Sequence, residues 1–496
     1  MSKVIATPGV YIQEMNAFSS SVVAVPTAIP AFVGYTGRAM RGTKSLLNKP
    51  TRVGSLAEYV EFFGGGPKTT YTIEENDETR YKLSADEGKE FYLYNSMRLF
   101  YANGGGPCYI VSVGNYSNGV KASDLNNVET GGGLHTLLKE HEPTMTVIPD
   151  AVLLEKADCH SLQQAMVNQA AKLMDRVAIV DVHEGYKDRT LDEEDVVSQF
   201  REGVGNNFLN YAAAYYPWLN TTIVQADELS YTNISNIDGL SAILLKEADE
   251  MLAAGLIKQK RHDEVKAVIE QLSDPGADVD TVSNTLLAVS PTFKDIMKDL
   301  RLEMNLMPPS ACMAGIYSLV DSTVGVHQSP ANISLSSVVS PTVNINNEEQ
   351  EDLNLPLNGK AINAIRGFMG KGVLVWGART LDGNSQDWRY ISVRRTMIML
   401  EQSIKIASEA YVFAPNNAST WANVKASISN FLLNKWKEGA LVGASPNQAF
   451  EVYLGLGVTM TPNDILDGFM KITVKVAIVR PAEFIVITFQ QKMQEA

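Results

Sequence analysis

Apolar strands alternate with amphipathic helices between about residue 50 and residue 220. "TMTVIPD" and "RVAIVDV" have the composition of buried strands, and "SLQQAMVNQAAKLMD" between them has the apolar spacing of an amphipathic helix. A helix of this kind must bury one face, and a neighbouring sheet supplies the partner surface. The alternation therefore predicts a layered α/β domain, with further strands near Ala31–Tyr35 and Cys108–Val113.

Residues 222–306 break this pattern. Segments such as "AILLKEADEMLAAGLI" and "TFKDIMKDLRLEM" follow one another with helical spacing and no strand between them. Between residues 225 and 305 there are 15 Asp/Glu and 8 Lys/Arg, a balance of −7. Because the flanking "YYPWL" and "MPPSACMAGIYS" both fit the α/β body, we expect an inserted acidic helical subdomain on the surface.

The charge of the chain is also uneven toward its C-terminal end. The whole chain carries a net charge of −14, whereas residues 360–496 hold 15 Lys/Arg and 10 Asp/Glu. An acidic chain is a poor candidate for nucleic-acid binding, which normally requires a basic footprint. The basic C-terminal part instead suggests a face that meets an acidic protein partner.

The sequence has no motif for catalysis or for holding a cofactor or metal. Its two "GGGP" loops lack the GxxxxGK[ST] pattern, and neither HExxH nor GxSxG occurs. The three cysteines, Cys108, Cys159 and Cys312, are far apart and odd in number, which fits neither a disulfide framework nor a zinc site. We expect no catalytic residue, no cofactor and no metal, and hence a protein that is not an enzyme.

The N-terminus "MSKVIATPGVYIQEM" lacks the apolar run of a signal peptide. No run of about 18 apolar residues occurs in the chain, so we expect no membrane span.

The stretch "WGARTLDGNSQDWRYISVRRTMIMLEQSI" from Trp376 to Ile404 concentrates arginines. Its four arginines are Arg379, Arg389, Arg394 and Arg395. Arginine binds carboxylates and phosphates through two parallel hydrogen bonds. The cluster is therefore either an anion-binding site, as in a soluble α/β enzyme or anion-binding protein, or a set of structural ion-pair partners within the domain or across its contacts.

Several motifs together resemble one known family. In the C-terminal third these are "AINAIRGFMGKGVLVWGARTL", "WRYISVRRTMIMLEQSI", "VFAPNNASTWANV", "FLLNKWKEGALVGASPNQAFEV" and "RPAEFIVITFQQ", in the family's order. "TPGVYIQE" and "MPPSACMAGIYSLVDSTVGVHQSPAN" resemble its N-terminus and middle. The chain thus resembles the sheath subunit of contractile phage tails and contractile injection systems over most of its length. The segment 222–306 departs from the minimal family pattern.

The resemblance implies a structural protein that polymerises as stacked hexameric rings around an inner tube and contracts to drive the tube through a target envelope. It implies as partners other copies of the chain, the inner tube protein, baseplate proteins and terminator or cap proteins, with a recycling ATPase as a further candidate. Nucleic acid is not bound directly, and a membrane enters only as the target. Assembly is expected in the bacterial cytoplasm, within a phage tail or a tail-like particle that can be released.

The expected fold class is α/β (α+β), with an inner sheath core, an outer α/β domain and a helical insert. The expected boundaries are an extended N-terminal arm at 1–30, the outer domain at 31–221 and 307–330, the insert at 222–306, the inner sheath domain at 331–480 and a C-terminal arm strand at 481–496. The inner domain is expected to include the N-terminal arm.

Both ends of the chain are strand-forming and have no evident place in a self-contained domain. The resemblance implies that they add strands to sheets of neighbouring subunits, where main-chain hydrogen bonds supply the affinity. The strand residues are Val10, Tyr11 and Ile12 at one end and Phe484, Ile485, Val486 and Ile487 at the other. A helix near 420–438 is the candidate contact with the inner tube, through Lys425, Lys435 and Lys437.

Overall fold

The computed structural model describes residues 22–190 and 192–484, which form two compact units. Among the described residues, one unit comprises residues 22–25 and Met399–Val479, and the other comprises Pro26–Ile398 and 480–484. Helix α12 (Ile391–Glu409) contains the point of division. The sequence placed a domain boundary at residue 331, whereas the structure divides the chain within this helix.

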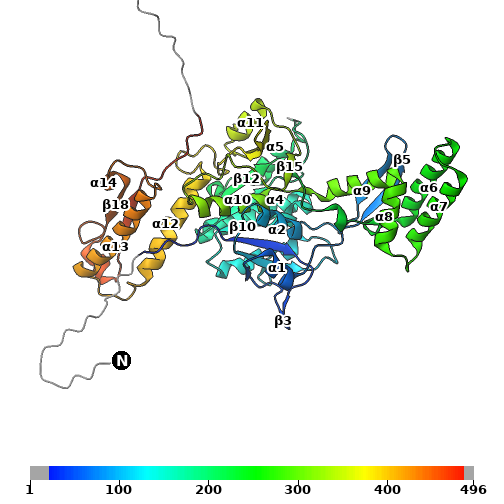
Figure 1. The fold of residues 1–496 in the computed structure, drawn as a ribbon. Coiled ribbons are helices and arrows are strands. Elements are labelled where there is room, and N and C mark those ends of the chain that lie inside the picture. Colours follow the sequence, from blue (N-terminus) through cyan, green and yellow to red (C-terminus); the bar gives the residue numbers. More distant parts are fainter. Residues whose placement is uncertain (1–21, 191, 485–496) are drawn as a thin grey trace, which may run out of the picture. The chain divides into compact units, whose positions relative to one another are not determined.

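The larger unit is built on a mixed eight-stranded sheet (Figure 1). Five neighbouring pairs are parallel, and the two outermost pairs, β16 with β17 and β4 with β7, are antiparallel. In spatial order the strands are β17 (Gly372–Val375), β16 (Asn363–Phe368), β12 (Ala212–Tyr216), β11 (Val177–Asp181), β10 (Met145–Val147), β1 (Pro30–Tyr35), β7 (Cys108–Gly114) and β4 (Thr51–Val53). The α/β class and the strands predicted near 31–35 and 108–113 are confirmed.

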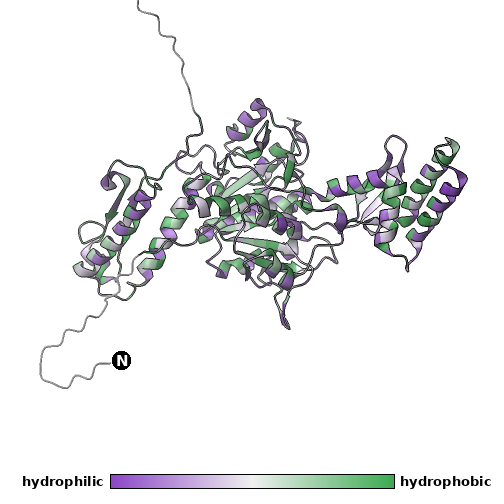
Figure 2. Ribbon diagram, in the orientation of Figure 1, coloured by the Kyte–Doolittle hydropathy of each residue, from purple (hydrophilic) through white to green (hydrophobic). Residues whose placement is uncertain are grey.

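The central strands are buried on both faces, which explains their continuous apolar runs. In β11, Val177 and Ile179 face one hydrophobic core while Ala178 and Val180 face another, because successive side chains point to opposite sides of a strand. Figure 2 shows the hydrophobic residues concentrated in the strands and on the inner faces of the helices. The first core includes residues of α1 (Leu56–Phe63), α2 (Leu93–Ala102) and α10 (Ser310–Thr323), and the second includes residues of α4 (Lys156–Leu173), α5 (Val196–Gly203) and α11 (Asn347–Asn354).

Two buried carboxylates tie chain segments to this sheet. Asp150 accepts hydrogen bonds from the backbone N–H groups of Tyr35, Tyr92 and Leu93, at 3.1, 2.6 and 3.2 Å. Asp181, at the end of β11, accepts from the backbone N–H of Ser310 at 2.7 Å and from the Ser310 hydroxyl, so it caps the start of α10. Burial raises the pKa of Asp150 to about 6 and that of Asp181 to about 7.

A third hydrophobic core belongs to the segment that the sequence identified as helical. Its helices are α6 (Ile237–Ala253), α7 (Gln259–Glu270), α8 (Val279–Val289) and α9 (Pro291–Met304). An antiparallel hairpin from much earlier in the chain, β5 (Tyr71–Asn76) and β6 (Arg80–Ala85), joins them, since Tyr71 and Ile73 pack in the same core. The helical segment therefore shares its core with a hairpin that sequence reasoning assigned to the α/β body.

Short elements complete the larger unit. A three-stranded antiparallel sheet consists of β14 (Leu306–Met307), β13 (Leu219–Thr221) and β15 (Val338–Pro341), and two-stranded pairs are formed by β2 (Met40–Arg41) with β3 (Lys44–Ser45) and by β8 (Asn126–Asn127) with β9 (Gly132–Gly133). The short helix α3 (Ala122–Leu125) precedes β8.

The smaller unit combines helices with a two-stranded sheet. It contains α13 (Ala418–Lys437), α14 (Pro446–Ala449), β18 (Phe450–Tyr453), α15 (Pro462–Leu466) and β19 (Thr473–Val476). The antiparallel pair β18–β19 has no further strand beside either member among the described residues. Two strands alone are marginally stable, and their outer edges carry unpaired backbone groups that can accept another strand.

Candidate functional site

Two ion-pair clusters of the larger unit lie near the points where the chain leads to its described ends. We call Arg379, Glu483, Asn354 and Tyr390 the C-terminal anchor, because Glu483 lies next to the last described residue. We call Arg395, Asp321, Thr27 and Tyr317 the N-terminal anchor, because Thr27 lies close to the first described residues. Each anchor joins segments that are far apart in the sequence.

In the C-terminal anchor, Glu483 meets Arg379 in a bidentate pair. Nε of Arg379 donates to Oε1 at 3.0 Å and Nη2 donates to Oε2 at 2.6 Å. Nη1 of Arg379 donates to the backbone oxygen of Asn354 at 2.9 Å, while the Asn354 side-chain amide and the Tyr390 hydroxyl donate to Glu483 at 2.8 and 3.0 Å. The Arg379 side chain is 1% exposed and that of Glu483 is 19% exposed. This geometry is the strong, orientation-specific form of an ion pair.

The pKa of Glu483 is lowered below its ordinary value. Burial acts to raise that pKa, but the hydrogen bonds from Arg379 and Asn354 outweigh it. A carboxyl whose pKa is lower in the folded state stabilises the fold above its unfolded pKa, which is about 4.3. This stabilisation is lost as the pH falls through the folded-state pKa.

Glu483→Gln is therefore expected to reduce the free energy of unfolding at pH 7 by about 1.5–3 kcal/mol, the range for a hydrogen bond to a charged group. The difference between wild type and variant should shrink as the pH falls below about 4, because wild-type Glu483 then becomes protonated. Denaturant titrations at several pH values measure this difference in the free energy of unfolding. A difference that stayed constant down to pH 2 would contradict the assignment of this carboxylate.

In the N-terminal anchor, Arg395 and Asp321 form a second bidentate pair. Nη1 donates to Oδ1 at 3.0 Å and Nη2 donates to Oδ2 at 2.6 Å, and both side chains are 3% exposed. Nη2 also donates to the backbone oxygen of Thr27 at 2.9 Å, and the guanidinium lies 4.6 Å from the ring centre of Tyr317. The pair thus joins α12, α10 and the segment that leads into β1.

The other two arginines of the stretch lie in different surroundings. Nε of Arg389 donates to the backbone oxygen of Ser385 at 3.0 Å. The guanidinium of Arg394 lies between two rings, 4.5 Å from the centre of Tyr211 and 4.4 Å from that of Trp388, which is cation–π geometry. The four arginines therefore do not converge on one empty site, and Arg379 and Arg395 each hold a carboxylate. Sequence reasoning did not find Glu483 or Asp321 as partners, since no local pattern links residues separated by 104 and 74 positions.

The candidate tube-contact lysines all lie on α13 in the smaller unit. Lys425 and Lys437 are exposed, whereas Lys435 is half-buried and pairs with Glu438 at 2.6 Å. The same helix buries Val424, Ile428, Phe431 and Leu432.

The strand residues expected in the arms fall mostly on parts of the chain that are not described. Val10, Tyr11 and Ile12, and likewise Ile485, Val486 and Ile487, lie outside the described residues. Phe484 is described and is 68% exposed. Residues 22–25 of the expected N-terminal arm are described and belong to the smaller unit, where the Val25 N–H donates to the Ser403 hydroxyl at 3.0 Å.

Cys108, Cys159 and His160 are buried within the α/β body. Burial raises the pKa of the Cys108 and Cys159 thiols to about 12, so neither is a ready nucleophile, and burial lowers the pKa of His160 to about 4. Among the described residues, no group of His, Cys, Asp and Glu side chains has the arrangement of a metal site. No helix within residues 22–190 and 192–484 is long and apolar enough to cross a bilayer.

Comparisons with known proteins bear on what this arrangement does. Residues 384–492 match the phage tail sheath C-terminal domain family. The tail sheath protein of Burkholderia phage BcepMu is 27% identical over 143 residues, an alignment that covers 28% of this chain and 30% of the phage protein.

Two solved structures are similar over almost the whole chain. The sheath complex of the PVC extracellular contractile injection system in its contracted state matches with a TM-score of 0.61 and 27% identity, covering 99% of each chain. The helical sheath of the anti-feeding prophage (AFP) in its contracted state matches with a TM-score of 0.61 and 27% identity, covering 99% of this chain and 100% of that one.

Proposed function

This chain belongs to the contractile tail sheath family, and we propose that it is the repeating subunit of a sheath that assembles as stacked six-membered rings around an inner tube. The protein is structural rather than enzymatic, and it is a component of a phage tail or a contractile injection particle. The match to two contracted sheaths along the full chain is the observation that carries the proposal.

A sheath subunit stores energy in the way copies pack, so contraction needs no nucleotide. The driving force is the free-energy difference between an extended and a contracted packing of the same subunits. The two units of this chain suit such a change, because each buries hydrophobic side chains of its own. Each can move as a rigid body while arms of extended chain keep neighbouring copies connected.

The smaller unit is the proposed receiver of those arms. Its two-stranded sheet β18–β19 leaves two edges open among the described residues, and strand addition there pairs backbone groups of one copy with those of another. The C-terminal anchor fixes the chain at Glu483, immediately before the residues expected to form the donated strand. The arm therefore starts from a defined place on the subunit that donates it.

Electron microscopy of the purified chain, alone and with the inner tube and baseplate proteins of its own particle, tests the proposal. Rings, tubes or helical sheaths are expected, with the tube and baseplate promoting the extended form. A chain that stays a uniform monomer at every salt concentration, with the tube protein and baseplate present, would overturn it.

The outer face of α13 is the proposed contact with the inner tube. Charge reversal of its two exposed lysines, Lys425→Glu with Lys437→Glu, is expected to slow templated assembly on preformed tubes about tenfold, because surface charges act mainly on association. Including Lys435→Glu should add little, since Lys435 is already paired with Glu438. Light scattering with and without tubes measures the rate.

Lys405→Glu is the matched control for this prediction, because Lys405 is an exposed lysine on α12 in the same unit. Equal slowing by the control, or unchanged templating by the double variant, would reject α13 as the tube contact.

A further inference from the structure

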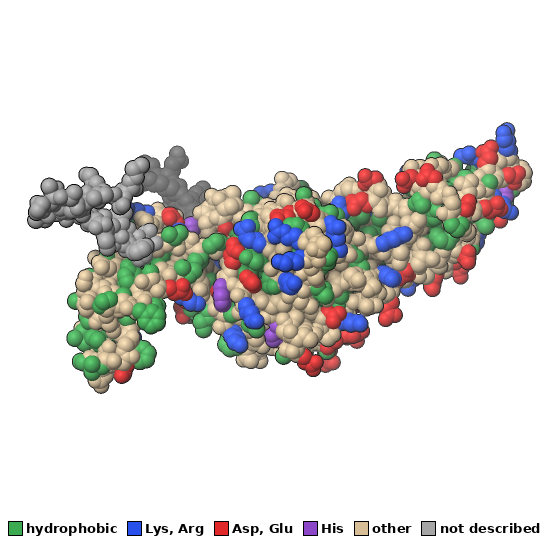
Figure 3. Space-filling view, turned by 90° about the horizontal axis from the view of Figure 1, so that it is seen from below, with side chains coloured by type: hydrophobic (Ala, Val, Ile, Leu, Met, Phe, Trp, Pro, Cys, Tyr) green, Lys and Arg blue, Asp and Glu red, His purple; other side chains and the backbone are tan. Residues whose placement is uncertain are grey.

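Two hairpins of the larger unit carry opposite charge. Residues 37–57 contain five Lys/Arg and no Asp/Glu, in a chain whose net charge is −14. They include the β2–β3 pair, which we call the basic hairpin (residues 40–45). The β5–β6 pair, which we call the acidic hairpin (residues 71–85), carries four acidic residues and two basic ones. Figure 3 shows Lys and Arg side chains gathered in the middle of one face and frequent Asp and Glu toward its helical end.

The basic hairpin is exposed, and no carboxylate of the described residues pairs with its two charged side chains. Arg41 and Lys44 face each other across the pair and are both exposed, next to Met40, which is 39% exposed. The Arg41 guanidinium lies 5.0 Å from the ring centre of Phe62, and no carboxylate lies within 4.0 Å of Arg41 or Lys44 among the described residues. Gly42 has a φ of 60° in the two-residue turn, and a Cβ added there would meet nothing within 4 Å, so the tip points into open space.

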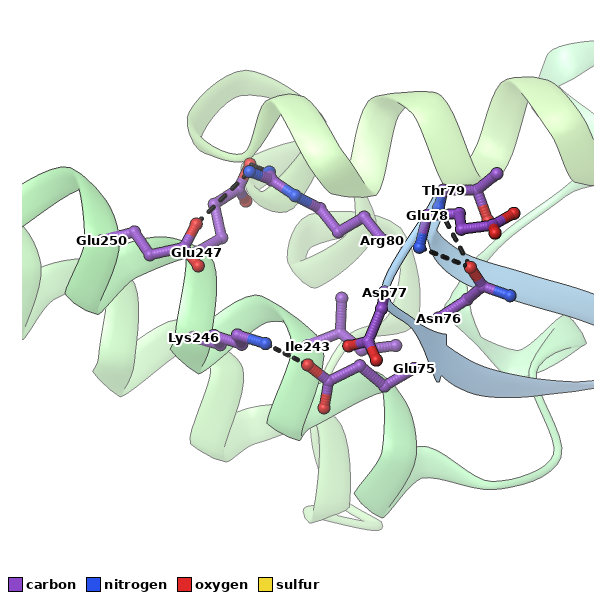
Figure 4. A pocket seen from close by; sticks show the side chains of 10 residues that line it. All are labelled: Glu75, Asn76, Asp77, Glu78, Thr79, Arg80, Ile243, Lys246, Glu247 and Glu250. Carbon is purple, nitrogen blue, oxygen red and sulfur yellow. Dashed lines mark hydrogen bonds and ion pairs between the residues drawn. The ribbon is translucent and has the colours of Figure 1, made fainter.

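The acidic hairpin likewise has exposed charged side chains at its turn, namely Asp77 and Glu78. It borders a cavity of about 410 Å³ beside α6 (Figure 4). Other charges that line this cavity are matched, since Glu75 pairs with Lys246 and Arg80 pairs with Glu250 at 3.3 Å.

The acidic side chains of the turn, unlike those paired elsewhere in the cavity, have no basic partner among the described residues. Asp77 and Glu78 are exposed and have no Lys or Arg within 4.0 Å among the described residues. The backbone N–H groups of Glu78 and Thr79 donate to the Asn76 side chain at 2.8 and 3.0 Å, which stabilises the backbone of the turn from which both side chains extend.

We propose that the basic hairpin of one copy docks on the acidic hairpin of a neighbouring copy, with Arg41 and Lys44 against Asp77 and Glu78. The inference rests on the proposed function, because a sheath repeats every contact between copies. A contact between two different surfaces of the same chain propagates through a lattice, since each copy offers both surfaces. This contact also offsets the electrostatic repulsion between copies, each of which has a net charge of −14.

Charge exchange tests the pairing. Reversing the basic tip (Arg41→Glu with Lys44→Glu) or the acidic turn (Asp77→Lys with Glu78→Lys) should each raise the critical concentration for sheath assembly by about tenfold or more. Combining the four substitutions in one chain restores opposite charges and should return assembly to near the wild-type value. Sedimentation at a series of protein concentrations gives the critical concentration.

Single reversals of exposed charges elsewhere serve as controls. Lys172→Glu on α4 and Glu270→Lys on α7 should leave the critical concentration within about twofold of wild type. Thermal unfolding confirms that every variant is folded. Normal assembly by both reversed hairpins, or failure of the fourfold variant to recover, would overturn the contact. A wild-type chain that never polymerises is a different result, which overturns the proposed function.

Cross-linking locates the contact without relying on assembly yields. Chains with Lys44→Cys and chains with Glu78→Cys are mixed, assembled and treated with a short bismaleimide. The three native cysteines are buried, so reaction is confined to the new thiols. A product of two chains is expected from the mixture in assembled sheaths and not from either variant alone. Sheaths that form but give single chains after treatment would overturn the proposal.

Discussion

Chains that lack residues 1–20, or residues 485–496, are expected to form no ordered tubes while keeping a folded body. The reason lies in how the described parts of the chain are stabilised. The eight-stranded sheet and its two cores lie entirely within residues 26–398, so neither deletion removes a core side chain. The C-terminal deletion also keeps Glu483, and with it the Arg379 pair. What each deletion removes is a segment that the sequence predicts to add a strand to a sheet of a neighbouring subunit.

The expected loss is large because the arms are the proposed links between copies. Strand addition contributes a row of backbone hydrogen bonds at once, and a lattice multiplies that contribution over every neighbour. Electron microscopy scores ordered tubes, and circular dichroism with thermal unfolding scores the folded body. Ordered tubes formed by both truncated chains would reject the arm model.

A matched pair of point substitutions separates strand addition from simple loss of residues. Ile487→Pro removes a backbone N–H donor and cannot lie within a paired strand, whereas Ile487→Val keeps both the donor and the strand preference. Tubes should be lost with proline and kept with valine. If the proline and valine variants formed tubes equally well, the backbone N–H of residue 487 would not be needed for assembly.

The sequence predicted the parts of the fold that depend on local pattern. The strands around residues 31–35 and 108–113 and the α/β layering were evident, because a doubly covered strand needs a continuous apolar run and its helices need one apolar face. The helices between 237 and 304 were evident for the same reason. These features need no knowledge of distant residues.

What the sequence did not predict depends on contacts between distant segments. Residues 71–85 were assigned to the α/β body, yet Tyr71 and Ile73 pack into the helical core because their hairpin lies beside α6. β16 and β17 were read as part of a separate C-terminal domain, yet β16 pairs with β12 and completes the main sheet. The arginine stretch suggested ion pairs, but only the fold brings Arg379 to Glu483 and Arg395 to Asp321.

Removal of either partner of the N-terminal anchor is expected to cause the largest loss of stability among single substitutions of charged residues. Arg395→Met leaves the Asp321 carboxylate 3% exposed and without its guanidinium, and Asp321→Leu leaves the buried Arg395 guanidinium without its carboxylate. An uncompensated buried charge costs about 3–5 kcal/mol. For a unit of this size that corresponds to a fall in melting temperature of roughly 4–6 °C. Arg389→Met is the control, since Arg389 is half-buried and contacts a backbone oxygen, and it should cost less than about 1 kcal/mol.

The double substitution Arg395→Met with Asp321→Leu distinguishes a true pair from two independent effects. Removing both charges leaves nothing unpaired, so the double variant should be more stable than the sum of the single losses predicts, by about 1–3 kcal/mol. Thermal and denaturant unfolding of the four chains complete the cycle. Additive losses would mean that the two residues stabilise the fold separately. Because Arg395 also holds the backbone of Thr27, coupling would further mean that the pair fixes the N-terminal arm to α10 and α12, and the single variants should then assemble poorly even where they remain folded.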